Sequence, residues 1–335
     1  MQIIVTGATG FIGSYLCHYL KARGHSVIPF SRSLTEAFVK ELQPDRYIEC
    51  DVTSEKLRHL RVSADMIIHL ASANEVISRS FRSGIEISVV GTKQLLDFAV
   101  RSGIGRFMFF STLQVYGTEP EGMIAETTPV RPQNDYALNH LFAEQYVAMY
   151  AQKGLLRGAI IRPSNVYGRF HSPTVNRWTM VPACFCKEAL DSGTITIRSS
   201  GKQFRSFVSL ENVARACEAI ISRFPDGNEI YLVGSNQTFS ILDIARKVQR
   251  IYWELFSEET ELIVAGDEPQ RPNRFSVSTS KLTHLGYRPD ESCTLEETIR
   301  WLFRYLLLLS YKGVCGRDGG SQPHEKKEFP DKAWT

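Results

Sequence analysis

Three glycines near the start of the chain have the spacing of a turn that binds phosphate groups. Gly7, Gly10 and Gly13 follow a short apolar run at 2–5 and open an amphipathic helical stretch. In such a strand–turn–helix unit, one glycine permits the tight turn, one lets the backbone approach a pyrophosphate, and one lets the helix pack close to the strand. The free N–H groups at the start of the helix then face the phosphates. The sequence TGATGFIG at 6–13 therefore predicts a dinucleotide-binding turn.

The end of the next predicted strand, at 26–30, indicates which dinucleotide is bound. An acidic residue at this point usually holds the ribose hydroxyls of NAD, whereas a nearby arginine suits the 2′-phosphate of NADP. No acid stands at 30–33, but Arg32 does. The sequence therefore favours NADP(H), with NAD(H) as the alternative; the other interpretation of Arg32 is a solvated loop charge.

Further apolar runs alternate with helical stretches along the first half of the chain. The runs lie at 47–50, 66–70 and 106–110, and a helical pattern covers 91–102. Strands that alternate with helices indicate an α/β fold with a parallel, doubly wound sheet of the Rossmann type. Ligands of such sheets bind at the carboxyl ends of the strands, which is where Asp51, Ala71 and Thr112 fall.

Length, charge and cysteine content narrow the class of protein. The chain has 335 residues, enough for one large domain or two coupled ones. A net charge of +3 does not argue for a nucleic-acid or membrane surface. The seven cysteines are dispersed, so we expect reduced thiols in a cytoplasmic protein and no metal site. We see no signal-peptide pattern, and the apolar run at 301–311 is too short for a membrane span.

A series of motifs in a fixed order carries a resemblance to a known enzyme family. The motifs are TGATGFIG at 6–13, CDV at 50–52, IIHLAS at 67–72, GT at 91–92, FFSTLQVYG at 109–117, YALNH at 136–140, IIRPSNVYG at 160–168, GKQFRSFVSLENVA at 201–214, EIYLVGSNQTFSI at 229–241 and RPNRFSVSTSKLTHLGYRP at 271–289. The chain resembles the extended short-chain dehydrogenase/reductases, in the branch of NAD(P)-dependent epimerases and dehydratases that act on nucleotide sugars. The resemblance covers almost the whole chain.

The resemblance implies roles for the residues that match these motifs. Tyr136 would pass a proton to or from a sugar oxygen as hydride moves to or from the nicotinamide, and Thr112 would hydrogen-bond the same oxygen. Asn165 lies where nicotinamide and sugar meet. Arg205 and Arg271 would bind the pyrophosphate of the nucleotide, which suits the guanidinium fork. The expected cofactor-binding residues are Gly7, Gly10, Phe11, Ile12, Gly13, Arg32, Asp51, Val52, Leu70, Ala71, Ser72 and Pro163.

Position 140 departs from the family, which has a lysine four residues after the tyrosine. On a helix Tyr136 and His140 share a face, and the charge of the family's lysine lowers the pKa of the tyrosine. An imidazole with its ordinary pKa of about 6.5 is mostly neutral at pH 7. Three interpretations compete: His140 is a working catalytic substitute in a pH-sensitive or slower enzyme, the protein binds its ligands but turns over poorly, or another lysine reaches the site.

Two more departures bear on the reaction. Family dehydratases carry Asp-Glu after the threonine, where this chain has Leu113-Gln114. Neither side chain titrates, so we do not expect loss of water from the sugar. Ser88 stands where the family usually has an asparagine that helps to position the active-site helix. The sequence favours a 4-ketoreductase or 4-epimerase of nucleotide sugars, with a catalytically impaired NAD(P)- or nucleotide-sugar-binding protein as the alternative.

The resemblance also implies two interwoven domains. We expect a dinucleotide-binding domain at 1–168 with about 207–235, a smaller substrate-binding domain at 169–206 and 236–311, and a disordered tail at 312–335. Helices at 91–102 and 138–152 match those that form a dimer interface in relatives, so a homodimer is implied. The expected partners are a nucleotide-sugar substrate and a second copy of the chain, with no nucleic acid and no membrane.

Overall fold

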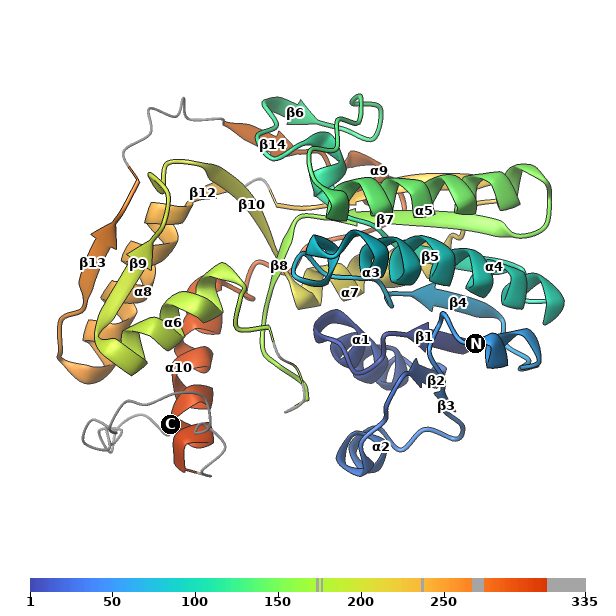
Figure 1. The fold of residues 1–335 in the computed structure, drawn as a ribbon, viewed down its shortest axis with the longest axis horizontal. Coiled ribbons are helices and arrows are strands. Elements are labelled where there is room, and N and C mark those ends of the chain that lie inside the picture. The colour runs from blue at the N-terminus through green and yellow to red at the C-terminus, as the bar shows by residue number, and fades with distance from the viewer. Residues whose placement is uncertain (173–174, 176, 236–237, 267–273, 312–335) are drawn as a thin grey trace.

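The first part of the fold is a parallel sheet in the order β11-β7-β5-β4-β1-β2-β3. The computed structural model describes residues 1–172, 175, 177–235, 238–266 and 274–311, and within them this sheet has seven strands (Figure 1). The strands are β1 (Gln2–Thr6), β2 (Ser26–Ser31), β3 (Ile48–Glu49), β4 (Met66–His69), β5 (Arg106–Phe110), β7 (Arg157–Pro163) and β11 (Asn228–Val233). The doubly wound α/β fold expected from the sequence is confirmed.

Helices cover both faces of this sheet because side chains alternate along each strand. Ile3 and Val5 of β1 pack with one set of helices, and Ile4 packs with the other. The first set is α1 (Phe11–Ala22), α2 (Glu36–Leu42), α7 (Leu210–Ser222) and α9 (Ser280–His284). The second set includes α4 (Gly91–Arg101) and α5 (Asp135–Gln152). Before α4 lie the 3-10 turns η1 (Glu55–Arg58) and η2 (Ile77–Arg79), the helix α3 (Phe81–Ile85) and the π-helical segment η3 (Glu86–Val90).

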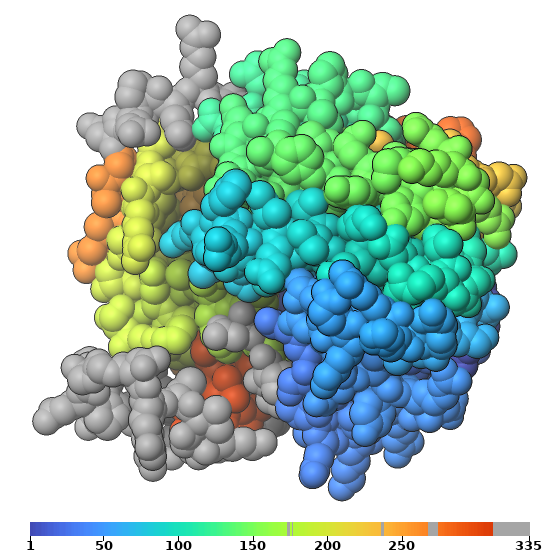
Figure 2. Space-filling model, turned by 45° about the vertical axis from the view of Figure 1, so that its right-hand side comes forward, coloured from blue at the N-terminus to red at the C-terminus, as the bar shows by residue number. Residues whose placement is uncertain are grey.

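A second lobe has its own core, at the left of Figure 1. Its helices are α6 (Val181–Ser192), α8 (Ile241–Phe256) and α10 (Leu295–Tyr311), and its paired strands are β9 (Thr194–Ile197) and β13 (Glu261–Val264). Figure 2 shows the surface of the N-terminal part, from blue to green, against the yellow-green surface of this lobe. Among the described residues, no helix combines the length and the apolar character that crossing a bilayer requires.

Small sheets connect the two lobes. β8 (Asn165–Tyr167) and β12 (Thr238–Ser240) flank β10 (Phe204–Ser209), and β6 (Gly122–Ile124) pairs with β14 (Phe275–Val277). The sequence predicted that the chain returns to the main sheet at about 207–235. Of this range, β11 joins the main sheet and α7 packs on α1, whereas the end of β10 pairs with β8. The domain boundaries stay a prediction, and the tail at 312–335 lies outside the described residues.

A buried ion pair fastens α5 to β7. The Arg162 guanidinium donates to both carboxylate oxygens of Glu144, at 2.9 and 2.5 Å, and to the Tyr116 hydroxyl at 2.6 Å. The side chains of Arg162 and Glu144 are only 3% and 1% exposed. Bidentate geometry and the extra hydrogen bond compensate these charges for their loss of water. The pair therefore fixes the helix that carries Tyr136 relative to the strand that ends at Pro163.

Replacing one member of this pair should be strongly destabilising. We expect Arg162→Met to lower the free energy of unfolding by about 3–5 kcal/mol, because Glu144 is left as an uncompensated buried charge. Urea denaturation measures the change. As a control, Arg157→Met removes a partner of Asp226, whose side chain is fully exposed, and should cost less than about 1 kcal/mol. Equal losses in the two variants would contradict the role given to the buried pair.

Candidate functional site

The predicted site residues converge on one cavity at the carboxyl ends of the parallel strands. The cavity has a volume of about 750 Å³ and takes its walls from both lobes. Its walls include Gly7, Gly10, Phe11, Ile12, Gly13, Arg32, Asp51, Val52, Leu70, Ala71, Ser72, Thr112, Tyr136, His140, Pro163, Asn165 and Arg205. The remaining predicted residue, Arg271, lies outside the described residues. The cavity lies where the strand order reverses around β1 and β4, the usual ligand position in such sheets.

The glycine turn between β1 and α1 forms a cradle that side chains would fill. Gly7 has φ +67°, a left-handed conformation that side chains disfavour. A Cβ atom on Gly13 would lie 2.1 Å from the Gly7 carbonyl oxygen, and one on Gly7 would lie 3.0 Å from the Ala71 nitrogen. Backbone N–H groups at the start of α1 can therefore come close to a pyrophosphate. These residues fit a dinucleotide.

Charged side chains mark the end of the cavity next to β2 and β3. Arg32 has a side chain 71% exposed, with Nε 3.9 Å from Asp51 Oδ2. The other carboxylate oxygen of Asp51 accepts hydrogen bonds from the backbone and the hydroxyl of Thr53. Ser31, the last residue of β2, lines the same wall and shares a hydrogen bond with Thr9. This end of the cavity therefore offers a hydroxyl and an exposed guanidinium group to a ligand.

Two residues of the cavity wall have buried hydroxyls without a hydrogen-bond partner among the described residues. Ser111 follows β5 and Ser164 follows Pro163 at the end of β7. Both Oγ atoms are buried and have no hydrogen-bond partner among the described residues. An unpaired buried hydroxyl costs free energy.

Tyr136 lies in the first turn of α5, and local hydrogen bonds set its position. Asn134 caps the helix by accepting from the Ala137 N–H at 2.8 Å, and its amide donates to Gln114 at 3.1 Å. Thr112, two residues after the end of β5, lines the cavity together with Tyr136. Burial raises the pKa of the Tyr136 hydroxyl above its usual range; nearby Glu75 adds to this rise, and hydrogen bonding to Thr112 opposes it.

His140 is held as a neutral, buried imidazole behind Tyr136. Its Nδ1 donates to the Tyr136 carbonyl at 2.9 Å, because a carbonyl can only accept. Its Nε2 lies 3.2 Å from the Ser72 hydroxyl, and the two rings of Tyr136 and His140 have centroids 4.4 Å apart. Burial lowers the pKa of His140 from 6.5. The imidazole therefore supplies hydrogen bonding and packing to the site, but no positive charge near neutral pH.

Ser88 connects the wall of the cavity to the helical layer. Its buried Oγ accepts from the Ala73 N–H at 3.0 Å and lies 2.8 Å from the Ser72 hydroxyl. Its carbonyl accepts from the Thr92 hydroxyl at 2.6 Å. In the structure Ser88 is fully buried and hydrogen-bonded to its surroundings, so it holds the loop after β4 in place.

The two residues that replace the acid and base of dehydratases have structural partners. Leu113 is buried in a small apolar cluster with Val115 and Ile124. Gln114 accepts from Asn134, the residue that caps α5. Neither side chain can exchange a proton at the cavity. That this chain does not remove water from a sugar stays a prediction.

The predicted substrate residues that the structure describes lie on the side of the second lobe. The amide of Asn165 donates to the Ser206 carbonyl at 3.0 Å, which joins β8 to β10. The Arg205 guanidinium donates to the carbonyls of Thr118 and Phe204, at 2.9 and 3.0 Å. Burial lowers the pKa of Arg205, but a guanidinium remains charged in proteins. Arg205 therefore offers its positive charge and further donors to an anionic group.

Sequence reasoning missed two charged residues near Tyr136. Glu75, in the loop after β4, and Arg177, just before α6, line the cavity and form an ion pair at 3.8 Å. The position of Glu75 after a strand end was a usable signal. Arg177 belongs to no motif, and its approach depends on the packing of the second lobe.

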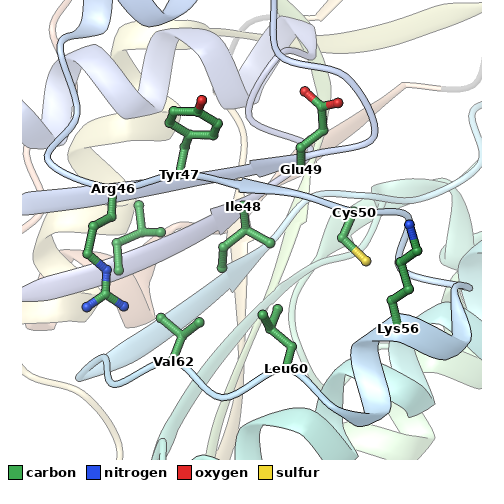
Figure 3. Close-up of a pocket in the computed structure, with 9 residues that line it drawn as sticks. Arg46, Tyr47, Ile48, Glu49, Cys50, Lys56, Leu60 and Val62 are labelled. Carbon is green, nitrogen blue, oxygen red and sulfur yellow. The ribbon is translucent and has the colours of Figure 1, made fainter.

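A smaller hollow of about 320 Å³ lies beside the edge strand β3. Figure 3 shows the aliphatic side chains of Ile48, Leu60 and Val62 between Arg46 and Lys56. This hollow contains neither the glycine cradle nor Tyr136, so the larger cavity is the candidate site.

The comparisons with known proteins agree with this class of fold and site. Residues 3–234 match the NAD dependent epimerase/dehydratase family. The chain belongs to this family, which confirms the resemblance seen in the sequence. A dTDP-D-glucose 4,6-dehydratase of Mus musculus is 28% identical over 319 residues, which are 90% of this chain and 88% of that protein.

Solved structures show the same architecture. A dTDP-glucose 4,6-dehydratase from Streptomyces venezuelae, with NAD bound, has a TM-score of 0.77 at 25% identity and covers 93% of this chain and 98% of its own. A UDP-glucuronic acid 4-epimerase from Bacillus cereus, in complex with UDP-glucuronic acid and NAD, has a TM-score of 0.79 at 24% identity and covers 92% and 100%. At that identity the second likeness shows the fold alone.

The buried state of His140 predicts a pH-dependent stability. Since its pKa is lowered on folding, the unfolded chain takes up the proton first as pH falls below about 6.5, and folding stability decreases. Between pH 7.5 and 5 the free energy of unfolding should fall in both proteins. We expect the fall to be smaller in His140→Gln than in the parent, by up to about 2 kcal/mol. Urea denaturation at both pH values measures the two losses. Equal losses in parent and variant would mean that His140 titrates normally in the folded protein.

Proposed function

We propose that this chain is a nicotinamide-dependent enzyme that epimerises or reduces a nucleotide sugar at C4. The observation that carries the proposal is the pairing of Tyr136 with Thr112 in a cavity that also contains the glycine cradle. A phenol and a hydroxyl that both hydrogen-bond the same oxygen of the sugar can deliver a proton to that oxygen or remove one from it. The family, whose relatives carry names of dehydratases and epimerases of nucleotide sugars, supports this class of substrate.

In this mechanism the residues of the chain place the sugar and move its proton. The cofactor, when bound, supplies or accepts hydride. Thr112 orients the reacting oxygen, and Tyr136 gives it a proton or takes one from it. Arg205 binds the anionic diphosphate of the substrate, and Asn165 lines the wall between the two ligands. Because Leu113 and Gln114 cannot act as acid and base, the reaction ends with the ketone or alcohol at C4, and no water is lost.

A specific observation favours a second candidate function. His140 is neutral, so the tyrosine lacks the cation that the family's lysine provides. A protein with this site could bind the dinucleotide and the nucleotide sugar but turn over poorly. Replacing His140 by lysine would then create activity, whereas in a working enzyme His140→Ala should lower it.

The cofactor that fits best is NADP(H), with NAD(H) as the alternative. Arg32 directly follows β2 with its side chain 71% exposed, and no acidic side chain precedes it on that strand. Planar guanidinium groups bind phosphate through paired hydrogen bonds. Its neighbour Asp51 partly balances the charge, and the solved relatives described above contain NAD. Preference for NADP(H) therefore rests on Arg32 alone.

Removing the phenol hydroxyl tests the proposed chemistry. We expect Tyr136→Phe to lower kcat by about 10²–10⁴-fold with a nucleotide-linked 4-keto sugar and NADPH, while NADPH binding is kept. Absorbance of the reduced nicotinamide follows reduction, and chromatography of the sugar products follows epimerisation. Tyr146→Phe, on the same helix but outside the cavity, is the matched control. Unchanged turnover in Tyr136→Phe would remove the tyrosine from the mechanism.

The role of Arg32 predicts a selective loss of affinity. We expect Arg32→Ser to weaken NADPH binding by about 10–100-fold, since a hydrogen bond to a charged group contributes roughly 1.5–3 kcal/mol. Binding of NADH should change little. Titrations followed by nicotinamide fluorescence measure both, with Arg58→Ser, outside the cavity, as control. A parent protein that binds NADH more tightly than NADPH would overturn the assignment.

Exposed apolar side chains support the homodimer that the resemblance implies. Leu138 and Phe142 on α5 are 38% and 47% exposed, and Phe81 and Val90 on the neighbouring helical segments are 69% and 41% exposed. The segments α3, η3 and α5 pack together. A second copy of the chain that contributes the same surface would cover these side chains. Sedimentation equilibrium of the purified chain measures the oligomeric state.

A further inference from the structure

Tyr136 needs a source of positive charge other than the residue four positions later. His140 is buried and neutral; its Nδ1 donates to the Tyr136 carbonyl, and its Nε2 lies 3.2 Å from the Ser72 hydroxyl. No lysine is among the described residues that line the cavity. The interpretation in which another lysine reaches the site therefore has no support in the described part of the chain.

The cations that do line the cavity are arginines. The charged and titratable side chains of its walls are Arg32, Cys50, Asp51, Glu75, Arg79, Tyr136, His140, Arg177 and Arg205. Of these, Glu75 and Arg177 act electrostatically on the Tyr136 hydroxyl, in opposite directions. They form an ion pair, Arg177 Nη1 to Glu75 Oε2, at 3.8 Å. The two side chains are 29% and 51% exposed, so each can also meet a ligand.

We propose that Arg177 is a positioning residue that supplies, from the second lobe, the positive charge near the Tyr136 hydroxyl that position 140 does not. Glu75 balances this charge in the free protein. The inference rests on the proposed function of Tyr136 as an acid–base group. Arg177 acts through Tyr136: a cation nearby favours the phenolate form, which is the form that accepts a proton from the sugar.

The packing of the second lobe holds Arg177 at the cavity. The Arg177 carbonyl accepts from the Met180 N–H at 3.1 Å, immediately before α6. The next residue, Trp178, lies nearly parallel to Tyr305 of α10, with centroids 6.2 Å apart and planes at 20°. Tyr305 in turn stacks on Trp301, at 4.7 Å and 13°. This aromatic stack ties the segment that carries Arg177 to the longest helix of the second lobe.

The ion pair gives the site two electrostatic states. With Glu75 close to Arg177, the carboxylate outweighs the guanidinium at Tyr136, and burial together with Glu75 keeps the phenol protonated. A sugar hydroxyl that hydrogen-bonds the Glu75 carboxylate would draw it away from Arg177. Arg177 would then act on Tyr136 without its counter-charge. Activation of the tyrosine would thus accompany occupation of the sugar subsite.

The test is a titration of the phenol itself in the full chain. Tyr136 is replaced by difluorotyrosine, whose phenol is more acidic, and fluorine NMR follows its chemical shift with pH in the absence of cofactor. We expect Arg177→Gln to raise the pKa of this phenol by about one unit and Glu75→Gln to lower it. Arg177→Lys should keep it near the parent value. Arg79→Gln, an arginine elsewhere in the wall, should leave it unchanged.

The outcomes separate this inference from the proposed function. An unchanged phenol pKa in Arg177→Gln, or a rise in Arg79→Gln of the same size, would overturn the role of Arg177. If Arg177→Gln fails to fold, Glu75→Gln tests the electrostatic effect of the ion pair on the phenol pKa, with the opposite sign. In an active enzyme, the basic limb of kcat against pH should also move upward in Arg177→Gln. Because the titration needs no turnover, it can succeed even if Tyr136→Phe shows that the reaction is a different one.

Discussion

The buried ion pair between Arg162 and Glu144 is the constraint on which the geometry of the site depends. It joins the middle of α5 to the end of β7. The Tyr116 hydroxyl, in the turn after β5, accepts a further hydrogen bond from Arg162. These three elements carry the phenol, its hydroxyl partner and the strand end at Pro163. A shift of α5 along the sheet would break a bidentate contact that water cannot replace in the interior. The position of Tyr136 relative to the strand ends therefore depends on this polar contact inside an apolar layer.

A series of buried hydrogen bonds stabilises the neighbouring point of the sheet, between β1 and β4, where the strand order reverses. Thr6 at the end of β1 accepts from the N–H groups of Leu70 and Ala71, so its own proton goes to His69 Nδ1 at 2.7 Å. His69 Nε2 then donates to Thr92 at 2.9 Å, and Thr92 donates to the Ser88 carbonyl. Burial lowers the pKa of His69 to about 3, which keeps this ring neutral. The wall next to Ser72 is thus fixed by hydroxyls and imidazoles, none of them charged.

Much of the fold and of the cavity could be predicted because parallel topology brings strand ends together. The glycine turn, Asp51, Ala71, Thr112 and Pro163 each follow a strand, so locating the strands was enough to collect them. The protonation state of His140 could not be derived from the strand positions, since it depends on burial and on contacts with Ser72 and the Tyr136 carbonyl. Arg177 was invisible for a similar reason. Its position depends on an aromatic stack between residues more than 120 positions apart in the sequence, Trp178 and Tyr305.

The strand pairings between the lobes have a consequence for how this protein can diversify. β6, from the first half of the chain, pairs with β14 near its end, and β10 lies between β8 and β12. The second lobe is therefore not a contiguous module that recombination could exchange for another. A new ligand specificity must arise through substitutions of single wall residues within a scaffold inherited whole. The four departures from the family pattern, at positions 88, 113, 114 and 140, all lie outside the paired strands, and Leu113, Gln114 and His140 line the cavity.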